Sequence, residues 1–297
     1  MKSVNQKNMT LTKLKQKIAV LLFLIVLIAT DSLAQSKPSI RFGTYNFGLD
    51  HMNPAEQVDF LEDLGYKSFF FRVKTPKDLA LLKGYNAALL DSDRDFKIES
   101  VYHPYRPTDR VAMAGYWKEV INELSGTSIS FSLILWDLDE PSLEKKLIEI
   151  VDYAKQANVE IVLYPHYGSS VEDAEDALAL IEKLGRPKHL KLSFHLCHEA
   201  RAGNAYRLND VASKVKDYMV LTTISGAKKV FFTSGLDWSD AIRPLNDSEY
   251  DLTLFMDALN SIEYSGPVIL HTFGIKDPAP EVHLKESMTV WKTLIKK

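Results

Sequence analysis

Cysteine is almost absent from this 297-residue sequence, which contains only Cys197. No disulfide can form within the chain, so its stability must come from a packed core. A buried, inert thiol is the usual state of such a cysteine. A nucleophilic role is the alternative for Cys197.

Strong charge of one sign is also missing. The sequence has 36 basic and 39 acidic residues, a net charge of −3, and no long basic run. Proteins that bind nucleic acid need a positive surface to neutralise phosphates, so we expect no nucleic-acid partner. The segment "TYNFGLDHMNP" (44–54) lacks the G-x-G-x-x-G turn of dinucleotide-binding sheets. We therefore expect no nucleotide cofactor.

One hydrophobic run, "IAVLLFLIVLIAT" (18–30), stands near the N-terminus. It is shorter than the roughly 20 residues of a membrane-spanning helix. Lysines precede it, and the small-x-small sequence Ser32-Leu33-Ala34 follows it, as in a secretory signal peptide. We predict a signal peptide over residues 1–34, a mature domain over 35–297, a periplasmic or secreted location, and no stable membrane insertion after cleavage. An uncleaved anchor is the alternative.

From Ser39 onward, β-branched and aromatic segments alternate with segments of helical spacing. Leu143, Leu147, Ile150 and Ala154, for example, form one apolar helical stripe. Strands alternating with helices indicate a parallel sheet. Eight such units over 35–297 predict an α/β fold, the (β/α)8 TIM barrel, with an open doubly wound sheet as the rival. The expected strand segments are 39–48, 66–74, 96–106, 128–137, 160–168, 190–200, 219–227 and 266–274. Residues 228–251 are long for a connection and are expected over the barrel mouth.

Histidines gather where these strands should end, which is where barrel enzymes keep their active sites. Five of the eight histidines fall there: His103, His166, His195, His198 and His271. A single such histidine is usually a hydrogen-bonded structural group. Five together predict a functional cluster, since imidazole serves both as acid/base and as metal ligand.

The two-residue period of strands refines this prediction. Tyr164 and His166 share one face of their strand, and we expect them to face the barrel axis. His195 and His198 differ in parity, so one of them must lie beyond the strand end. Further polar and aromatic residues near the strand ends complete the expected substrate-binding set: Asn46, Arg72, Lys74, His103, Trp136, Asp137, Tyr164 and Lys276.

Several motifs resemble the sugar phosphate isomerase/epimerase family, the xylose isomerase-like TIM barrels. They are "LYPHYG", "SFHLCHE", "TTISGA", "IRPL" followed by "YD", "YSGPVIL" and "HLKESMTVWKTL". The resemblance implies proton transfer on a carbon next to a sugar carbonyl, in many members with a divalent metal held by carboxylates and a histidine. This sequence departs from that pattern. His195 and His271 stand where acids are usual, Tyr164 and His166 where a glutamate is common, and Thr223 where a histidine is common, while His198 matches the family.

The resemblance and the signal peptide together predict an isomerase or epimerase acting on a non-phosphorylated sugar or keto-sugar. A lyase or hydratase on 3-keto-glycosides and a non-catalytic sugar-binding barrel are the alternatives. We assign acid/base roles to His166 and His198. His195 and His271 are assigned as metal ligands or oxyanion stabilisers. The expected cofactor is one divalent metal, zinc or manganese, or none; imidazole ligands suit a transition metal better than magnesium.

Overall fold

The computed structural model describes residues 40–90, 94–113, 115–228 and 237–296. The signal peptide predicted over 1–34 lies outside the described residues. Eight parallel strands pair in chain order and close, β1 with β8, into a barrel, so the predicted (β/α)8 fold is confirmed. The strands are β1 (Phe42–Thr44), β2 (Ser68–Arg72), β3 (Lys97–Tyr105), β4 (Ser130–Leu135), β5 (Ile161–Leu163), β6 (Leu190–His195), β7 (Met219–Ile224) and β8 (Val268–Leu270).

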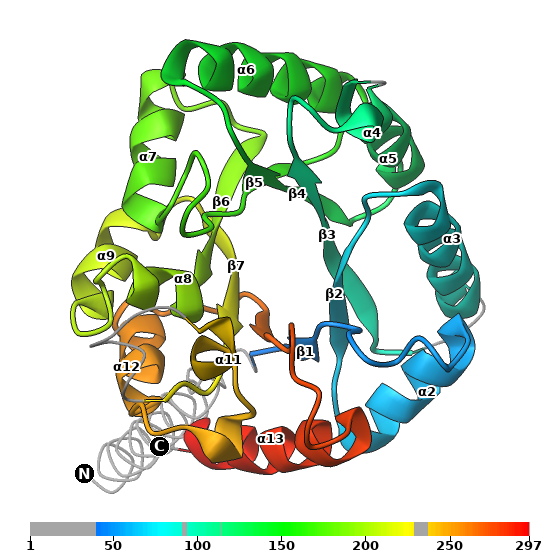
Figure 1. Cartoon of the computed structure of the whole chain (residues 1–297), viewed down its shortest axis with the longest axis vertical. Coiled ribbons are helices and arrows are strands. Elements are labelled where there is room, and N and C mark those ends of the chain that lie inside the picture. The colour runs from blue at the N-terminus through cyan, green and yellow to red at the C-terminus, as the bar shows by residue number, and fades with distance from the viewer. Residues whose placement is uncertain (1–39, 91–93, 114, 229–236, 297) are drawn as a thin grey trace, which may run out of the picture. The chain divides into compact units, whose positions relative to one another are not determined.

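Helices surround this ring of strands, and α13 closes it beside α2 (Figure 1). The helices after the first four strands are α2 (Pro54–Leu64), α3 (Pro76–Leu90), α4 (Arg110–Met113), α5 (Tyr116–Leu124) and α6 (Glu140–Gln156). Those after the last four strands are α7 (Ala174–Lys183), α8 (Leu196–Arg201), α9 (Leu208–Val215), α11 (Trp238–Ala241), η1 (Leu245–Asp247), α12 (Thr253–Ser261) and α13 (Pro280–Leu294). Within the described ranges, no helix is long and apolar enough to cross a membrane.

Local sequence signals set several helix ends. Asn53 and Glu56 form a reciprocal capping box at the start of α2. Thr75 and Asp78 exchange the same kind of hydrogen bonds before α3. Gly65 ends α2 in the left-handed conformation, with φ of 98°. These short-range bonds satisfy backbone groups that a helix leaves open, and they depend only on residues a few positions apart.

Buried side chains pack on both faces of the barrel strands. The helix-facing positions of the strands join the large outer core. Near the bottom of the barrel, a Cβ on Gly43 would lie 2.2 Å from Ser68 Oγ, so only glycine fits there. Above it, inward-facing residues form a second, mostly aromatic cluster: Tyr45, Phe70, Tyr102, Ile134, Tyr164, Leu221 and Ile269. This cluster is the floor of the space at the carboxyl ends of the strands.

The described part of the segment after β7, residues 237–251, reaches that space, as the sequence predicted. Gly226 and Arg243 pair as an antiparallel bridge, and Ser225 Oγ donates to the carbonyl oxygen of Ala241 at 3.0 Å. These bonds hold α11 against the end of β7. Trp238 and Ile242 consequently lie at the barrel mouth, where both line a cavity.

Candidate active site

A cavity of about 180 Å³ opens at the carboxyl ends of the strands. Imidazole and aromatic groups dominate its wall, and no carboxylate among the described residues lines it. The lining residues are Tyr102, Ile134, Tyr164, His166, His198, Trp238, Ile242, His271 and Phe273. They come from β3, β4 and α8, the ends of β5 and β8, and the segment after β7. Residues far apart in the sequence therefore converge on one small space.

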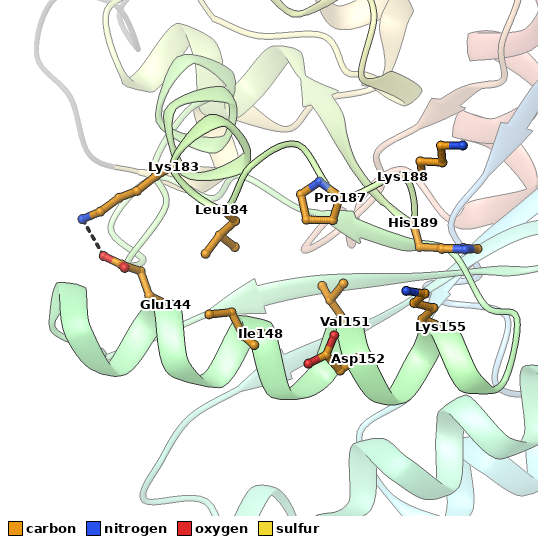
Figure 2. A pocket seen from close by; sticks show the side chains of 10 residues that line it. All are labelled: Glu144, Ile148, Val151, Asp152, Lys155, Lys183, Leu184, Pro187, Lys188 and His189. Carbon is orange, nitrogen blue, oxygen red and sulfur yellow. Dashed lines mark ion pairs between the residues drawn. The ribbon is translucent and has the colours of Figure 1, made fainter.

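A larger cavity, of about 610 Å³, lies elsewhere, on the outer surface between α6 and the segment that leads into β6 (Figure 2). Glu144 and Lys183 form an ion pair at one end of it. Its wall mixes acidic, basic and aliphatic groups, and none of the predicted site residues contributes to it. Because barrel chemistry takes place at the carboxyl ends of the strands, the smaller cavity is the candidate active site.

His166 follows β5 and faces this cavity together with Tyr164, as the strand period predicted. Its Nδ1 donates to the carbonyl oxygen of Tyr167 at 3.0 Å. In the neutral ring this leaves Nε2 with a lone pair. Burial lowers the pKa of His166 to about 4, so the ring is neutral at pH 7. Trp136 and Trp238 are its aromatic neighbours, with ring centroids 4.8 and 5.7 Å from that of His166.

His198 lies on α8, past the end of β6, and its ring centroid is 4.0 Å from that of His166. The side chain is 1% exposed. Neither ring nitrogen has a hydrogen-bond partner among the described residues. Burial also holds the pKa of His198 well below its usual value. The ring is thus neutral and buried, with both polar atoms unused.

In contrast, both ring nitrogens of His195 have hydrogen-bond partners. Ser193 Oγ donates to the carbonyl oxygen of Leu163 and so accepts from His195 Nε2 at 2.6 Å. His195 Nδ1 then accepts from the hydroxyl of Thr223 at 2.9 Å. The ring stacks on Tyr164, with centroids 3.7 Å apart and planes within 7°. Both nitrogens that a metal would need are occupied, so His195 supports the wall of the site.

His271 follows β8 and belongs to a buried chain of polar groups. Its Nε2 lies 3.3 Å from the hydroxyl of Tyr164, which lies 2.9 Å from the hydroxyl of Tyr45. Its Nδ1 accepts a long bond, 3.4 Å, from the backbone N–H of Phe273. Burial lowers the pKa of His271 to about 3 and raises the pKa values of both tyrosines. All three groups are therefore neutral at pH 7.

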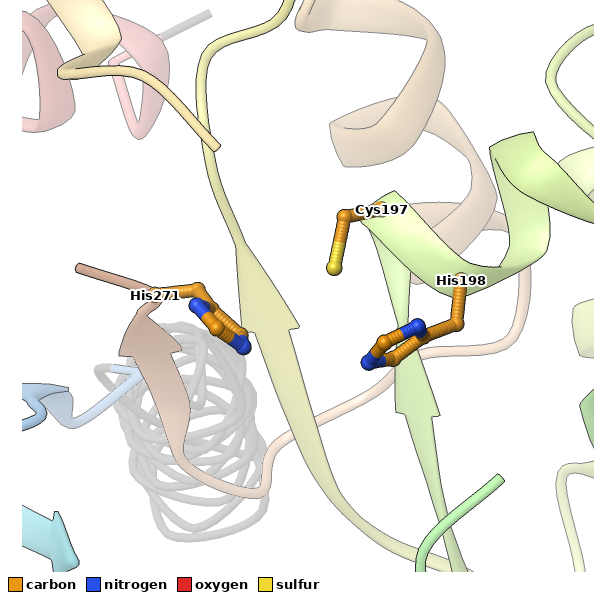
Figure 3. A group of neighbouring side chains, drawn as sticks. All are labelled: Cys197, His198 and His271. Carbon is orange, nitrogen blue, oxygen red and sulfur yellow. The ribbon is translucent and has the colours of Figure 1, made fainter. Parts of the chain in front are cut away.

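Cys197, His198 and His271 bring three potential metal ligands together (Figure 3). One donor atom from each lies within 4.8 Å of the others. Burial raises the pKa of the Cys197 thiol to about 12. Glu199, the adjacent acid, is turned away, because its carboxylate accepts hydrogen bonds from the backbone N–H of Ala174 and from the Asn204 side chain. The site therefore offers sulfur and nitrogen donors and does not fit a carboxylate-held metal.

The structure does not bring three of the predicted substrate-binding residues to the cavity. His103 lies on the helix-facing side of β3, where its Nδ1 donates to the carbonyl oxygen of Val73 at 2.8 Å. Asn46 donates to the hydroxyl of Tyr85 at 3.1 Å, and Tyr85 is part of the outer core. Lys276 is exposed beyond β8. None of the three lines the cavity.

Four other predicted residues follow strand ends at the upper edge of the barrel, outside the cavity wall. Trp136 packs on His166 and carries the guanidinium of Arg106 at 4.4 Å from its ring centre. Asp137 forms an ion pair with Arg106 at 2.6 Å. Lys74 pairs with Asp109 at 2.6 Å, and Arg72 is exposed at the end of β2 without an ion pair in the described part of the chain.

Sequence reasoning did not place several lining residues in the site. The sequence analysis places His103 in the site and leaves out its neighbour Tyr102, although only one of two neighbouring strand residues can face inward. Phe273 shares its strand face with His271, so parity could have indicated it. Trp238 and Ile242 lie in the long segment after β7, and their places depend on how that segment folds back. Cys197 was read as an inert core thiol.

These features define an α/β barrel with a buried, imidazole-rich cavity at the carboxyl ends of its strands. Residues 110–294 match the family model described as xylose isomerase-like TIM barrel, and the chain belongs to that family. The family resemblance expected from the motifs is thereby confirmed. No curated protein matches the chain.

Solved structures share the fold at low sequence identity. The apo form of 3-keto-D-glucoside 4-epimerase from E. coli superposes with a TM-score of 0.67 at 12% identity, over 86% of this chain and 100% of that chain. The probable 3-DHS dehydratase from Bacillus anthracis gives 0.67 at 11% identity, over 85% and 99%. D-psicose 3-epimerase from Clostridium cellulolyticum gives 0.62 at 11% identity, over 86% and 99%. These likenesses establish the fold.

Proposed function

We propose that this protein is a carbohydrate-active enzyme that removes a proton from the carbon next to a sugar carbonyl, giving epimerisation or isomerisation. The observation that carries the proposal is the convergence of His166, His198 and His271 with Tyr164 around one cavity. Family membership and the epimerases that share the fold support the same reaction class.

His166 is the acid/base residue in this proposal. Its Nδ1–H is held by the carbonyl oxygen of Tyr167, which orients the ring and leaves Nε2 ready to accept a proton. The ring is neutral at pH 7, as a general base must be. Trp136 and Trp238 border it and limit contact with water. The negative charge that develops on the sugar oxygen would then be stabilised from the side of His198 and His271.

The size of the cavity restricts the substrate. Sites for drug-sized ligands usually measure about 300–1,000 Å³, whereas this cavity measures about 180 Å³. A single small sugar or keto-sugar suits it better than an oligosaccharide. We further propose a periplasmic or secreted location, from the signal peptide predicted over 1–34. A non-phosphorylated substrate follows from that location, since sugar phosphates are cytoplasmic.

A lyase or hydratase acting on 3-keto-glycosides is the second candidate. Elimination and hydration share an enolate-like species with epimerisation, so an acid/base group at His166 takes part in each of them. Two of the structures that share the fold are described as a 3-keto-D-glucoside epimerase and a probable dehydratase, which favours including this candidate. A non-catalytic sugar-binding barrel is the third candidate.

Proton exchange separates these functions. The purified protein is incubated in D₂O with free sugars and with 3-keto-glycosides, and the products are followed by NMR. An epimerase incorporates deuterium at the carbon next to the carbonyl and inverts the configuration of that carbon. An isomerase also incorporates deuterium and moves the carbonyl group to the neighbouring carbon. A lyase releases the aglycone. Binding of a sugar without exchange or product would refute the enzyme proposal and support a binding module.

A further inference from the structure

His198 is an exception among the polar groups of the site. Buried polar atoms are nearly always hydrogen-bonded, and those that are not call for a specific explanation, a missing ion among them. His198 is 1% exposed and both of its ring nitrogens lack a partner among the described residues. The neighbouring His195 is hydrogen-bonded at both nitrogens. The fold can thus provide hydrogen-bond partners for a buried imidazole at this end of the barrel, but the ring nitrogens of His198 have none in the described structure.

The open imidazole faces two further donors. Figure 3 shows the sulfur of Cys197, at the start of α8, directed into the space between the rings of His198 and His271. One donor atom of each residue lies within 4.8 Å of the others. His271 is held only by contacts of 3.3 and 3.4 Å, long for bonds to nitrogen. A ligand to this ring therefore competes only with weak contacts.

We propose that Cys197, His198 and His271 form a thiolate–imidazole site for one zinc ion. Zinc takes sulfur ligands at about 2.3 Å and imidazole ligands at about 2.0–2.1 Å, with tetrahedral geometry. Its donors then lie about 3.3–3.7 Å apart, so small side-chain rotations bring the present group to that spacing. Two of the three residues, His198 and His271, also line the cavity. The fourth position is thereby available to a small molecule, as in catalytic zinc sites.

The donor set decides the choice of metal. Thiolate and imidazole favour zinc and similar transition metals, while carboxylate and carbonyl oxygens favour magnesium, calcium and manganese. The described residues place no carboxylate on the cavity wall, and Glu199 is engaged with Ala174 and Asn204. The structure thus favours zinc over manganese. It also moves the ligand role from His195, which the sequence suggested, to Cys197 and His198.

Tyr164 contacts one of the proposed zinc ligands, His271, from outside the metal site. Groups that hydrogen-bond to a ligand fix its orientation and are typical of metal sites. Tyr164 lies between Tyr45 and the Nε2 of His271, and it stacks on the locked ring of His195. Zinc binding is a separate property from the proposed sugar reaction, because it can be measured without any sugar. A negative metal titration therefore leaves the deuterium-exchange assay interpretable, and a negative exchange assay leaves the metal titration interpretable.

Cobalt substitution tests the site in the full-length protein. The purified protein is freed of metal with a chelator and titrated with Co²⁺. We expect one equivalent to bind, with intense visible bands typical of tetrahedral cobalt and a thiolate-to-cobalt charge-transfer band in the near ultraviolet. Zn²⁺ should abolish the spectrum, while Mg²⁺ and Mn²⁺ in hundredfold excess should not. Because Cys197 is the only cysteine, a charge-transfer band must come from this residue. Absence of the band in the correctly folded wild-type protein would overturn the proposal.

Variants assign the ligands. Cys197→Ser should lose the charge-transfer band, and His198→Gln and His271→Gln should each weaken Co²⁺ binding by more than about 100-fold, beyond the loss typical of an outer-shell partner. His283→Gln is the matched control, because His283 is also buried with both nitrogens unpartnered in the described structure but lies on α13. It should bind Co²⁺ like the wild type. Equal loss in His283→Gln and His198→Gln would contradict the site. Circular dichroism checks that each variant is folded, and the wild-type competition series decides the matter where one is not.

Discussion

The rings of His166 and His198 lie 4.0 Å apart, centroid to centroid, with an interplanar angle of 39°. His166 is oriented by the carbonyl oxygen of Tyr167, whereas neither ring nitrogen of His198 has a hydrogen-bond partner within the described residues. The two neighbouring neutral imidazoles can therefore have different roles, His166 as the acid/base residue and His198 as a metal ligand. The contact places the proposed base directly beside the proposed metal site.

His166→Gln should reduce turnover by more than about 100-fold, because glutamine cannot accept a proton at the position of Nε2. The measurement is the rate of deuterium incorporation into the sugar. Metal binding should persist in this variant, since His166 is not one of the three donors. Turnover equal to the wild type would remove His166 from the mechanism.

His103→Gln provides a comparison at a second buried histidine. The sequence suggested that His103 lines the sugar, but its ring packs on the outer side of β3, near Phe131 and Tyr116. Turnover should stay within about twofold of the wild type. A loss as large as that of His166→Gln would show that the outer position of His103 does not describe the working enzyme.

Thr223→Val should destabilise the protein by about 1–3 kcal/mol, because it leaves Nδ1 of His195 buried without its hydrogen bond. Urea unfolding measures the effect. Thr289→Val, at an exposed position of α13, is the control and should change the free energy of unfolding by less than about 0.5 kcal/mol. Stoichiometric Co²⁺ binding should be retained in Thr223→Val. Loss of Co²⁺ binding with unchanged stability would contradict a purely structural role for the Thr223–His195 hydrogen bond.

Much of the fold was predictable because its signals are local. The period of two places Tyr164 and His166 on one face, and the capping box of Asn53 and Glu56 at the start of α2 spans only four residues. These features depend on residues within a few positions of one another. Closure of the barrel followed from the count of strand–helix units and needed no long-range detail.

The membership of the site was harder to predict because it depends on contacts between distant segments. Parity shows that Tyr102 and His103 face opposite ways, but only packing against Phe131 decides which one is outside. Likewise, His195 and His198 had to differ, yet the turn from β6 into α8 determines that Cys197 and His198 approach His271. That approach joins residues more than 70 positions apart.

Trp238→Ala should raise the KM for the sugar by about tenfold, because the ring covers His166 and His198 at centroid distances of 5.7 and 5.2 Å. Aromatic groups at such mouths supply much of the apolar contact that holds a small ligand. Trp238→Phe should recover most of the affinity. Steady-state kinetics test this, and a fall in kcat with unchanged KM would contradict a covering role.

Processing of the N-terminus tests the proposed location. Expressed in a bacterium with residues 1–297, the protein should appear in the periplasm or the medium and begin at Gln35, after the Ser32-Leu33-Ala34 site. Intact mass and N-terminal sequencing of the fractionated protein measure this. An unprocessed chain in the membrane fraction would support the anchor alternative.

His283 makes stability depend on pH in a defined direction. Burial lowers its pKa to about 4, against about 6.5 in an unfolded chain. Between these values the unfolded state binds a proton that the folded state does not, so falling pH favours unfolding. Wild-type stability should therefore drop relative to His283→Gln, by about 2–3 kcal/mol from pH 7 to pH 4. The other buried histidines are common to both proteins and cancel in the difference. Urea unfolding of both proteins across this range measures it, and parallel stability curves would show that His283 is as easily protonated in the folded protein as in the unfolded chain.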